Sequence, residues 1–151
     1  MEHRRWIVVG TDFSPAARRA LEHAAKLATE VGATVACVHA YEGSGGAPLD
    51  SEPPAAVLSQ LQQAVAHLRA RFPDIRVESF VRRGAPWDKL ANVACELGAE
   101  IIVVGACGES ERAEACFLGR VAERLAASTT RSVLIVSPRD SNRGTWTERS
   151  G

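Results

Sequence analysis

The sequence contains few aromatic residues and has no excess of charge of either sign. Phe, Trp and Tyr make up 5% of the 151 residues, whereas apolar residues as a whole make up 46%. We therefore expect one domain with a sizeable core built mainly from Ala, Val, Leu and Ile. Eighteen basic residues balance eighteen acidic ones, so the composition does not indicate a nucleic-acid-binding surface.

Long apolar runs are also missing. No run approaches the length of a membrane span, and the polar residues 1–5 lead into a short strand pattern rather than into the apolar core of a signal peptide. We therefore expect a cytoplasmic protein that contacts neither a membrane nor nucleic acid.

Cysteine is scarce, and its spacing matches no standard metal pattern. The four cysteines include no CxxC pair, and in the cytoplasm we expect them to be reduced. Cys37 and Cys95 fall within a predicted strand and a predicted helix, where we expect them in the core. Cys107 and Cys116 are interpreted as thiols without a chemical role. A redox pair, or a metal site formed together with His39, is the alternative.

Short apolar runs alternate with helical patterns along the chain. The third run alternates polar and apolar residues, which is typical of a half-buried strand at a sheet edge. This alternation of strands and helices predicts an α/β fold with a doubly wound parallel sheet. The expected strands are Trp6–Gly10, Thr34–Tyr41, Ile75–Val81, Ile101–Gly105 and Val133–Val136.

Helix signals lie between these runs. Ser14 and Pro15 are typical of a helix cap and first turn, and Gly32 is typical of a helix end. A Gly- and Pro-rich segment, residues 43–54, predicts a loop before the second helix. The second and third helices are predicted from apolar faces formed by Leu58, Leu61, Val65 and Leu68, and by Trp87, Leu90, Ala91, Ala94 and Leu97.

The stretch Glu100–Ser137 combines a strand, a glycine loop, a helix and a strand. The apolar run ends at Gly105, Gly108 follows, and Gly119 precedes an amphipathic helix. Glycines let backbone N–H groups approach an anion, and a helix N-terminus adds partial positive charge, so the stretch is typical of a phosphate cradle. Its spacing is neither the dinucleotide fingerprint nor the Walker loop, because no Lys-Ser or Lys-Thr pair follows the last glycine.

This loop resembles the signature of the universal stress protein family, which reads Gly, two residues, Gly, nine residues, Gly, then Ser or Thr. Residues 105–108 (GACG) match its first half, and residues 119–124 (GRVAER) resemble its second half, usually Gly-Ser-Val-(Ala/Ser)-Glu. Two features depart from it. Ten residues, 109–118, separate the second and third glycines, and Arg120 stands where the family's nucleotide binders carry a hydroxyl.

The resemblance covers roughly Arg5–Ser137, so we expect a universal stress protein-like domain at 1–138 and a flexible tail at 139–151. It implies a five-stranded parallel sheet of strand order 3-2-1-4-5 with helices on both faces. In such a sheet the ligand crevice lies between strands 1 and 4, where the winding reverses. The nucleotide-binding residues that it implies are Asp12, Ala40, Gly105, Gly108, Gly119, Arg120 and Val121.

Each implied site residue also has a purely structural interpretation. Asp12 can be a local turn acceptor that braces the next helix, since Ser14 already supplies the cap. Ala40 would act through its backbone and leaves no side-chain signature. His39 is interpreted as a satisfied strand-end histidine, because no acid or nucleophile is spaced to form a triad with it.

The function that we expect is a homodimeric regulatory or stress-response module with weak or no ATP binding. The alternative is a stress switch that binds ATP or another adenine nucleotide, with Mg²⁺ if the ligand is a triphosphate. No catalytic residue and no metal ligand is predicted, and a hydrolase ranks last because no general base or carboxylate cluster suits the loop. Glu109, Glu111 and Glu114 would repel a triphosphate, unless a bound Mg²⁺ reverses this effect.

The apolar character of the last expected strand predicts that the partner is a second copy of the chain. Val133, Leu134, Ile135 and Val136 form a continuous apolar run, yet the implied strand order places them at an edge. Because exposed apolar edges are an aggregation hazard, we expect antiparallel pairing with the same strand of a second copy.

Overall fold

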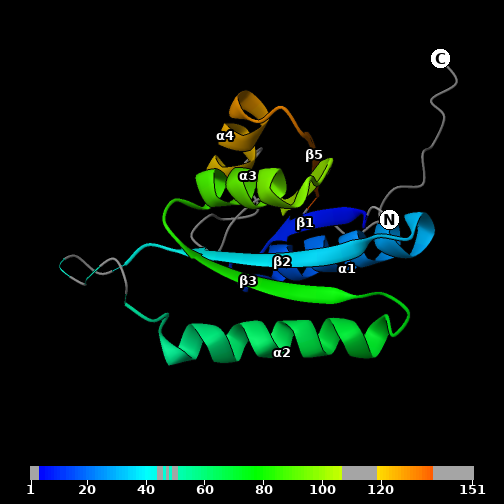
Figure 1. Cartoon of the computed structure of the whole chain (residues 1–151), viewed down its shortest axis with the longest axis horizontal. Coiled ribbons are helices and arrows are strands. Elements are labelled where there is room, and N and C mark those ends of the chain that lie inside the picture. The colour runs from blue at the N-terminus through cyan, green and yellow to red at the C-terminus, as the bar shows by residue number, and fades with distance from the viewer. Residues whose placement is uncertain (1–3, 44–45, 47, 49–50, 107–118, 138–151) are drawn as a thin grey trace, which may run out of the picture.

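The computed structural model describes residues 4–43, 46, 48, 51–106 and 119–137. Within these ranges the strands form one five-stranded sheet of order β3-β2-β1-β4-β5 (Figure 1), and every neighbouring pair is parallel. The predicted fold class and strand order are therefore confirmed. The elements are β1 (Trp6–Gly10), α1 (Pro15–Val31), β2 (Thr34–Tyr41), α2 (Ala55–Arg71), β3 (Val77–Arg83), α3 (Pro86–Leu97), β4 (Ile101–Gly105), α4 (Arg120–Ser128) and β5 (Ser132–Val136).

The ends of α1 follow from its sequence. The Ser14 hydroxyl accepts a hydrogen bond from the Ala17 N–H at 3.2 Å, and Pro15 occupies the first turn. Gly32 ends the helix with φ at 72°, a left-handed conformation that glycine adopts without strain, and its N–H bonds to the Ala28 carbonyl. Ser14 and Pro15 thus fix where α1 begins after β1, which places the β1–α1 turn, and Gly32 fixes where α1 ends.

Two helical layers cover the sheet. Figure 1 shows α3 and α4 on one side of the sheet and α2 on the other. Consecutive residues of β1 face opposite layers: Ile7 and Val9 pack with α1 and α2, whereas Val8 packs with α3 and α4. This alternation is the period of two that a strand imposes on its side chains. The core is accordingly split into two apolar clusters, one on each face.

The structure corrects two details of the second helix and third strand. Leu58 is 40% exposed, because the buried stripe of α2 runs through Leu61, Val65 and Leu68, spaced by four and three residues. β3 begins at Val77 rather than Ile75, since the Ile75 N–H instead bonds to the Phe72 carbonyl in the preceding turn. The predicted edge position of this strand is confirmed.

The two cysteines within the described ranges differ in environment. Cys37 is buried in β2, as predicted. The prediction for Cys95 is wrong, because this thiol is exposed. It follows the buried Ala94 on α3, and one residue step turns a side chain by about 100° around a helix axis. Cys107 and Cys116 lie outside the described residues, as does the expected tail at 139–151.

None of the described helices combines the length and the apolar character that crossing a bilayer requires.

Candidate functional site

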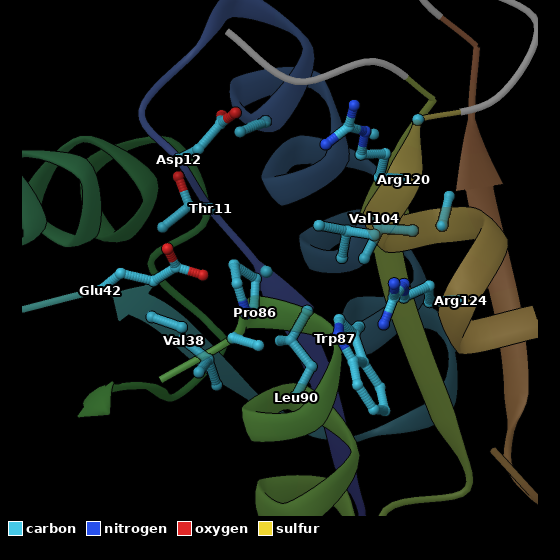
Figure 2. A pocket seen from close by; sticks show the side chains of 18 residues that line it. Thr11, Asp12, Val38, Glu42, Pro86, Trp87, Leu90, Val104, Arg120 and Arg124 are labelled. Carbon is cyan, nitrogen blue, oxygen red and sulfur yellow. The ribbon is translucent and has the colours of Figure 1, made fainter. Parts of the chain in front are cut away.

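A cavity of about 800 Å³ opens where the winding of the sheet reverses. Its floor is apolar and includes Val38 of β2, Leu90 of α3 and Val104 of β4 (Figure 2). The volume lies in the range of small-molecule and cofactor sites. The predicted site residues that line it are Asp12, Ala40, Gly105, Gly119, Arg120 and Val121. Gly108 lies outside the described residues.

The β1–α1 turn brings Asp12 to this cavity. Its Oδ1 accepts a hydrogen bond from the Ser14 N–H at 3.0 Å, which is the local bracing role that the structural interpretation predicted. The same side chain lines the cavity. The brace fixes the carboxylate beside the opening, so the structural interpretation and the ligand-binding one are compatible.

The end of β2 forms the neighbouring wall. Ala40 lines the cavity, as does Glu42, whose carboxylate the sequence did not single out. Nδ1 of His39 lies 2.8 Å from the Thr11 carbonyl oxygen, which confirms the interpretation of His39 as a satisfied strand-end histidine.

The N-terminus of α4 forms the opposite wall. The Gly119 N–H bonds to the Ala106 carbonyl, and Gly119 offers no side chain to cap the helix. The N–H groups of Arg120, Val121 and Ala122 belong to the first turn, where helix geometry provides no partner within the helix. All three residues line the cavity, so this wall carries the partial positive charge of a helix N-terminus.

Gly105 has a packing reason to be glycine. A Cβ atom added there would lie 3.1 Å from both the Cβ and the carbonyl oxygen of Ala16. The first turn of α1 therefore approaches the end of β4 more closely than a side chain would comfortably permit. This close approach accounts for a glycine at position 105 independently of any contact between glycine and an anion.

The third wall comes from the start of α3. Pro86 and Trp87 line the cavity, and the guanidinium carbon of Arg124 lies over the Trp87 ring, 5.4 Å from its centroid. This is a cation–π contact between α3 and α4. Sequence reasoning placed Trp87 only on the core face of its helix and did not select Arg124. No local pattern predicts the contact between them, because the two residues meet only through the packing of the helices.

Charge is distributed unevenly around the cavity. Asp12 and Glu42 stand at the ends of β1 and β2, whereas Arg120 and Arg124 stand on α4 at the other side (Figure 2). Within the part of the chain that the structure describes, no group of three or more His, Cys, Asp or Glu side chains is arranged to hold a metal. The cavity thus offers hydrogen-bond acceptors at one side and cations with free helix amides at the other.

The fold and this site define a doubly wound α/β protein whose ligand cavity lies at the sheet's switch point. The model of the Universal stress protein family matches residues 3–137, and the chain belongs to this family. A universal stress protein of Mycolicibacterium smegmatis is 30% identical over 137 residues, covering 88% of this chain and 46% of that protein. The chain therefore spans about half the length of this curated relative.

Solved structures give the same fold. A universal stress protein in complex with cAMP is 29% identical, with a TM-score of 0.69, 91% of this chain covered and 100% of that chain. A universal stress protein from Archaeoglobus fulgidus in complex with dAMP is 24% identical, with a TM-score of 0.69, 89% of this chain covered and 98% of that chain. The similarity to the dAMP-bound structure, at 24% identity, shows a shared fold alone.

Proposed function

We propose that this protein is a stress-response module of the cytoplasm that binds an adenine mononucleotide in the cavity and binds ATP only weakly. The observation that carries the proposal is the convergence of Asp12, Ala40 and the α4 N-terminus on one cavity. The relative that is 29% identical and was solved with cAMP supports an adenine ligand with a single phosphate. ATP as the physiological ligand, with Mg²⁺, is the alternative.

In this proposal the phosphate lies against α4. The Arg120 guanidinium donates to the phosphate oxygens, in two parallel hydrogen bonds where the geometry permits. The N–H groups of Val121 and Ala122 add the helix N-terminus. The charged Arg120 side chain thus takes the place of the hydroxyl that the family's nucleotide binders carry at this position.

The acidic side of the cavity receives the rest of the nucleotide. Asp12 and Glu42 accept hydrogen bonds from sugar hydroxyls, and the Ala40 backbone meets the base. A triphosphate chain carries several negative charges. Phosphate groups that extend from α4 toward the carboxylates of Asp12 and Glu42 are repelled by them. One phosphate matches the two arginines, which is why we favour a mononucleotide over ATP.

The proposed location of the ligand is tested by amide chemical shifts of the ¹⁵N-labelled protein during titration with cAMP. The expected result is a set of shifts at Asp12, Ala40 and Arg120–Ala122, with the Val77 amide of β3 unmoved as an internal control. Shifts spread over the surface, or confined to another face, would contradict the proposed site.

We further propose that the active form is a homodimer joined through β5. β5 is an edge of the described sheet, and Leu134 is 37% exposed there. The Ser132 N–H bonds toward β4, so the backbone groups of Val133 and Ile135 face the outer edge by alternation. Antiparallel pairing with the same strand of a second copy satisfies these groups and covers Leu134.

A further inference from the structure

The turn between β1 and α1 contains a strained residue. Phe13 has φ at 65°, and it is the one non-glycine residue with positive φ in the described part of the chain. For a bulky residue this left-handed conformation is unfavourable and persists only where the surroundings enforce it. Asp12 precedes Phe13 and reaches the cavity, so the contacts that hold Phe13 also hold Asp12.

Two hydrogen bonds from neighbouring β2 hold the start of this turn. The Thr11 N–H donates to the Val38 carbonyl at 2.9 Å, and His39 Nδ1 lies 2.8 Å from the Thr11 carbonyl oxygen. Because a carbonyl only accepts, Nδ1 of His39 carries the hydrogen and donates it. Both polar groups of the Thr11 backbone are thereby fixed to one strand.

The turn is closed by its own side chains. The Phe13 N–H donates to the Thr11 hydroxyl at 3.1 Å, and the Ser14 N–H donates to Asp12 as described above. The Phe13 ring stacks on the His39 ring, with centroids 4.5 Å apart and planes inclined by 29°. One imidazole therefore contacts the turn twice, by a hydrogen bond before Asp12 and by an aromatic stack after it.

We propose that His39 is a positioning residue for the cavity. It stands between Val38, which anchors Thr11, and Ala40, which lines the cavity. Through Thr11 and Phe13 it holds the strained turn that presents Asp12, while the same strand end presents Ala40. The part of this inference that concerns ligand affinity rests on the proposed nucleotide function, whereas the part that concerns the turn does not.

Two substitutions separate the two contacts of His39. His39→Asn places an amide N–H close to the position of Nδ1 and removes the ring. His39→Phe keeps a ring that can stack and removes the donor. His67 is exposed on α2, so His67→Phe is a matched control that makes the same chemical change away from the cavity.

The experiment is hydrogen exchange of the Phe13 and Ser14 amides in the free protein, followed by titration with cAMP. We expect His39→Phe to lower the protection of these two amides and the affinity for cAMP by about tenfold each, as the loss of one partly buried hydrogen bond implies. His39→Asn should keep both within about threefold, and His67→Phe should change neither. Unchanged protection of the turn in His39→Phe overturns the inference.

Equal loss of protection at the Val8 and Val9 amides of the core also overturns it, because His39 would then support the whole domain rather than the turn. A wild-type protein that binds no cAMP refutes the proposed function, and the exchange result still decides the role of His39. Should His39→Phe fail to fold, the tautomer of the neutral His39 ring in the wild type is the second test. Hydrogen on Nδ1 supports the inference, and hydrogen on Nε2 alone overturns it.

Discussion

The guanidinium of Arg124 lies 5.4 Å from the centroid of the Trp87 ring, and both side chains line the candidate cavity. The contact joins the start of α3 to the first turns of α4 across the opening between them. It places an indole, whose emission responds to nearby charge, beside the arginines that we assign to the phosphate. Trp87 should therefore report on ligand binding.

We expect cAMP to change the tryptophan emission of the wild-type protein, and Trp87→Phe to lose this change. Since Phe retains an apolar ring on the same wall, calorimetry should give an affinity for cAMP within about threefold of the wild type. Trp6→Phe is the matched control, because Trp6 is the first residue of β1, whereas the cavity lies at the C-terminal end of that strand. A ligand-dependent change that persists in Trp87→Phe and disappears in Trp6→Phe contradicts this placement of the ligand.

Arg120 should be the main contact of the phosphate. Arg120→Ala should weaken cAMP binding by about 10- to 100-fold, because a hydrogen bond to a charged group contributes about 1.5–3 kcal/mol. Arg18, exposed on α1, supplies the control Arg18→Ala. Isothermal titration calorimetry gives the affinity for cAMP of the wild type and of both variants. Equal affinities for the wild type and Arg120→Ala would show that Arg120 does not contact the phosphate.

The same position should limit ATP binding. Arg120→Ser combined with deletion of Leu118 restores the family's loop spacing and its hydroxyl, so we expect a higher affinity for ATP than in the wild type. Leu118 lies outside the described residues, and the expectation rests on the sequence motif. No gain in ATP affinity would show that the spacing of the loop does not control triphosphate binding.

Burial of Cys37 should make stability depend on alkaline pH. Burial raises the pKa of the Cys37 thiol from its ordinary value of 9.0 to about 12. Between these values the unfolded state has lost a proton that the folded state keeps, so the free energy of unfolding falls as pH rises. Below this window the thiol is protonated in both states and contributes no pH dependence.

The measurement is urea unfolding at about pH 8 and about pH 10. The fall in stability between these two pH values should be smaller for Cys37→Ala than for the wild type, whereas Cys95→Ala, at an exposed thiol, should match the wild type. An unchanged pH dependence in Cys37→Ala would mean that the thiol is not shielded from solvent.

The dimer prediction is tested at Leu134. Replacing Leu134 by Lys puts a charge on the exposed edge of β5 and should raise the dissociation constant of the dimer by at least about tenfold. Ile135→Pro should also weaken the dimer by removing an outward N–H, but Ile135 packs against the core, so its effect mixes folding with association. Leu58, which is 40% exposed on α2, supplies the control Leu58→Lys. Light scattering at micromolar concentration gives the molar mass of each of these proteins. A monomeric mass for the wild type contradicts the proposal.

Sequence reasoning was most successful where local chemistry decides the structure. Ser14, Pro15 and Gly32 mark the ends of α1 in the sequence and in the fold. The first, second and fourth strands have their predicted bounds, because a run of five to eight residues rich in apolar side chains and bounded by turn residues is typical of a buried strand and too short for most helices. The six predicted site residues within the described ranges line one cavity, since the strand order brings their segments together.

Residues whose roles depend on packing between distant elements were missed. Glu42 follows a strand end without any motif, and Arg124 meets Trp87 only because α4 packs beside α3. The contact of His39 with Thr11 joins β2 to the β1–α1 turn across 28 positions of sequence. Cys95 and Leu58 were misplaced because one residue decides which side of a helix is buried, and an Ala-rich apolar stripe fixes that side poorly.

The preference for a mononucleotide over ATP is tested most directly by calorimetric titration of the wild-type protein with cAMP and, separately, with ATP in the presence and absence of Mg²⁺. We predict saturable binding of cAMP with a dissociation constant at least about tenfold lower than that of ATP under either condition. ATP that binds as tightly as cAMP or more tightly, with or without Mg²⁺, would contradict this account of the cavity.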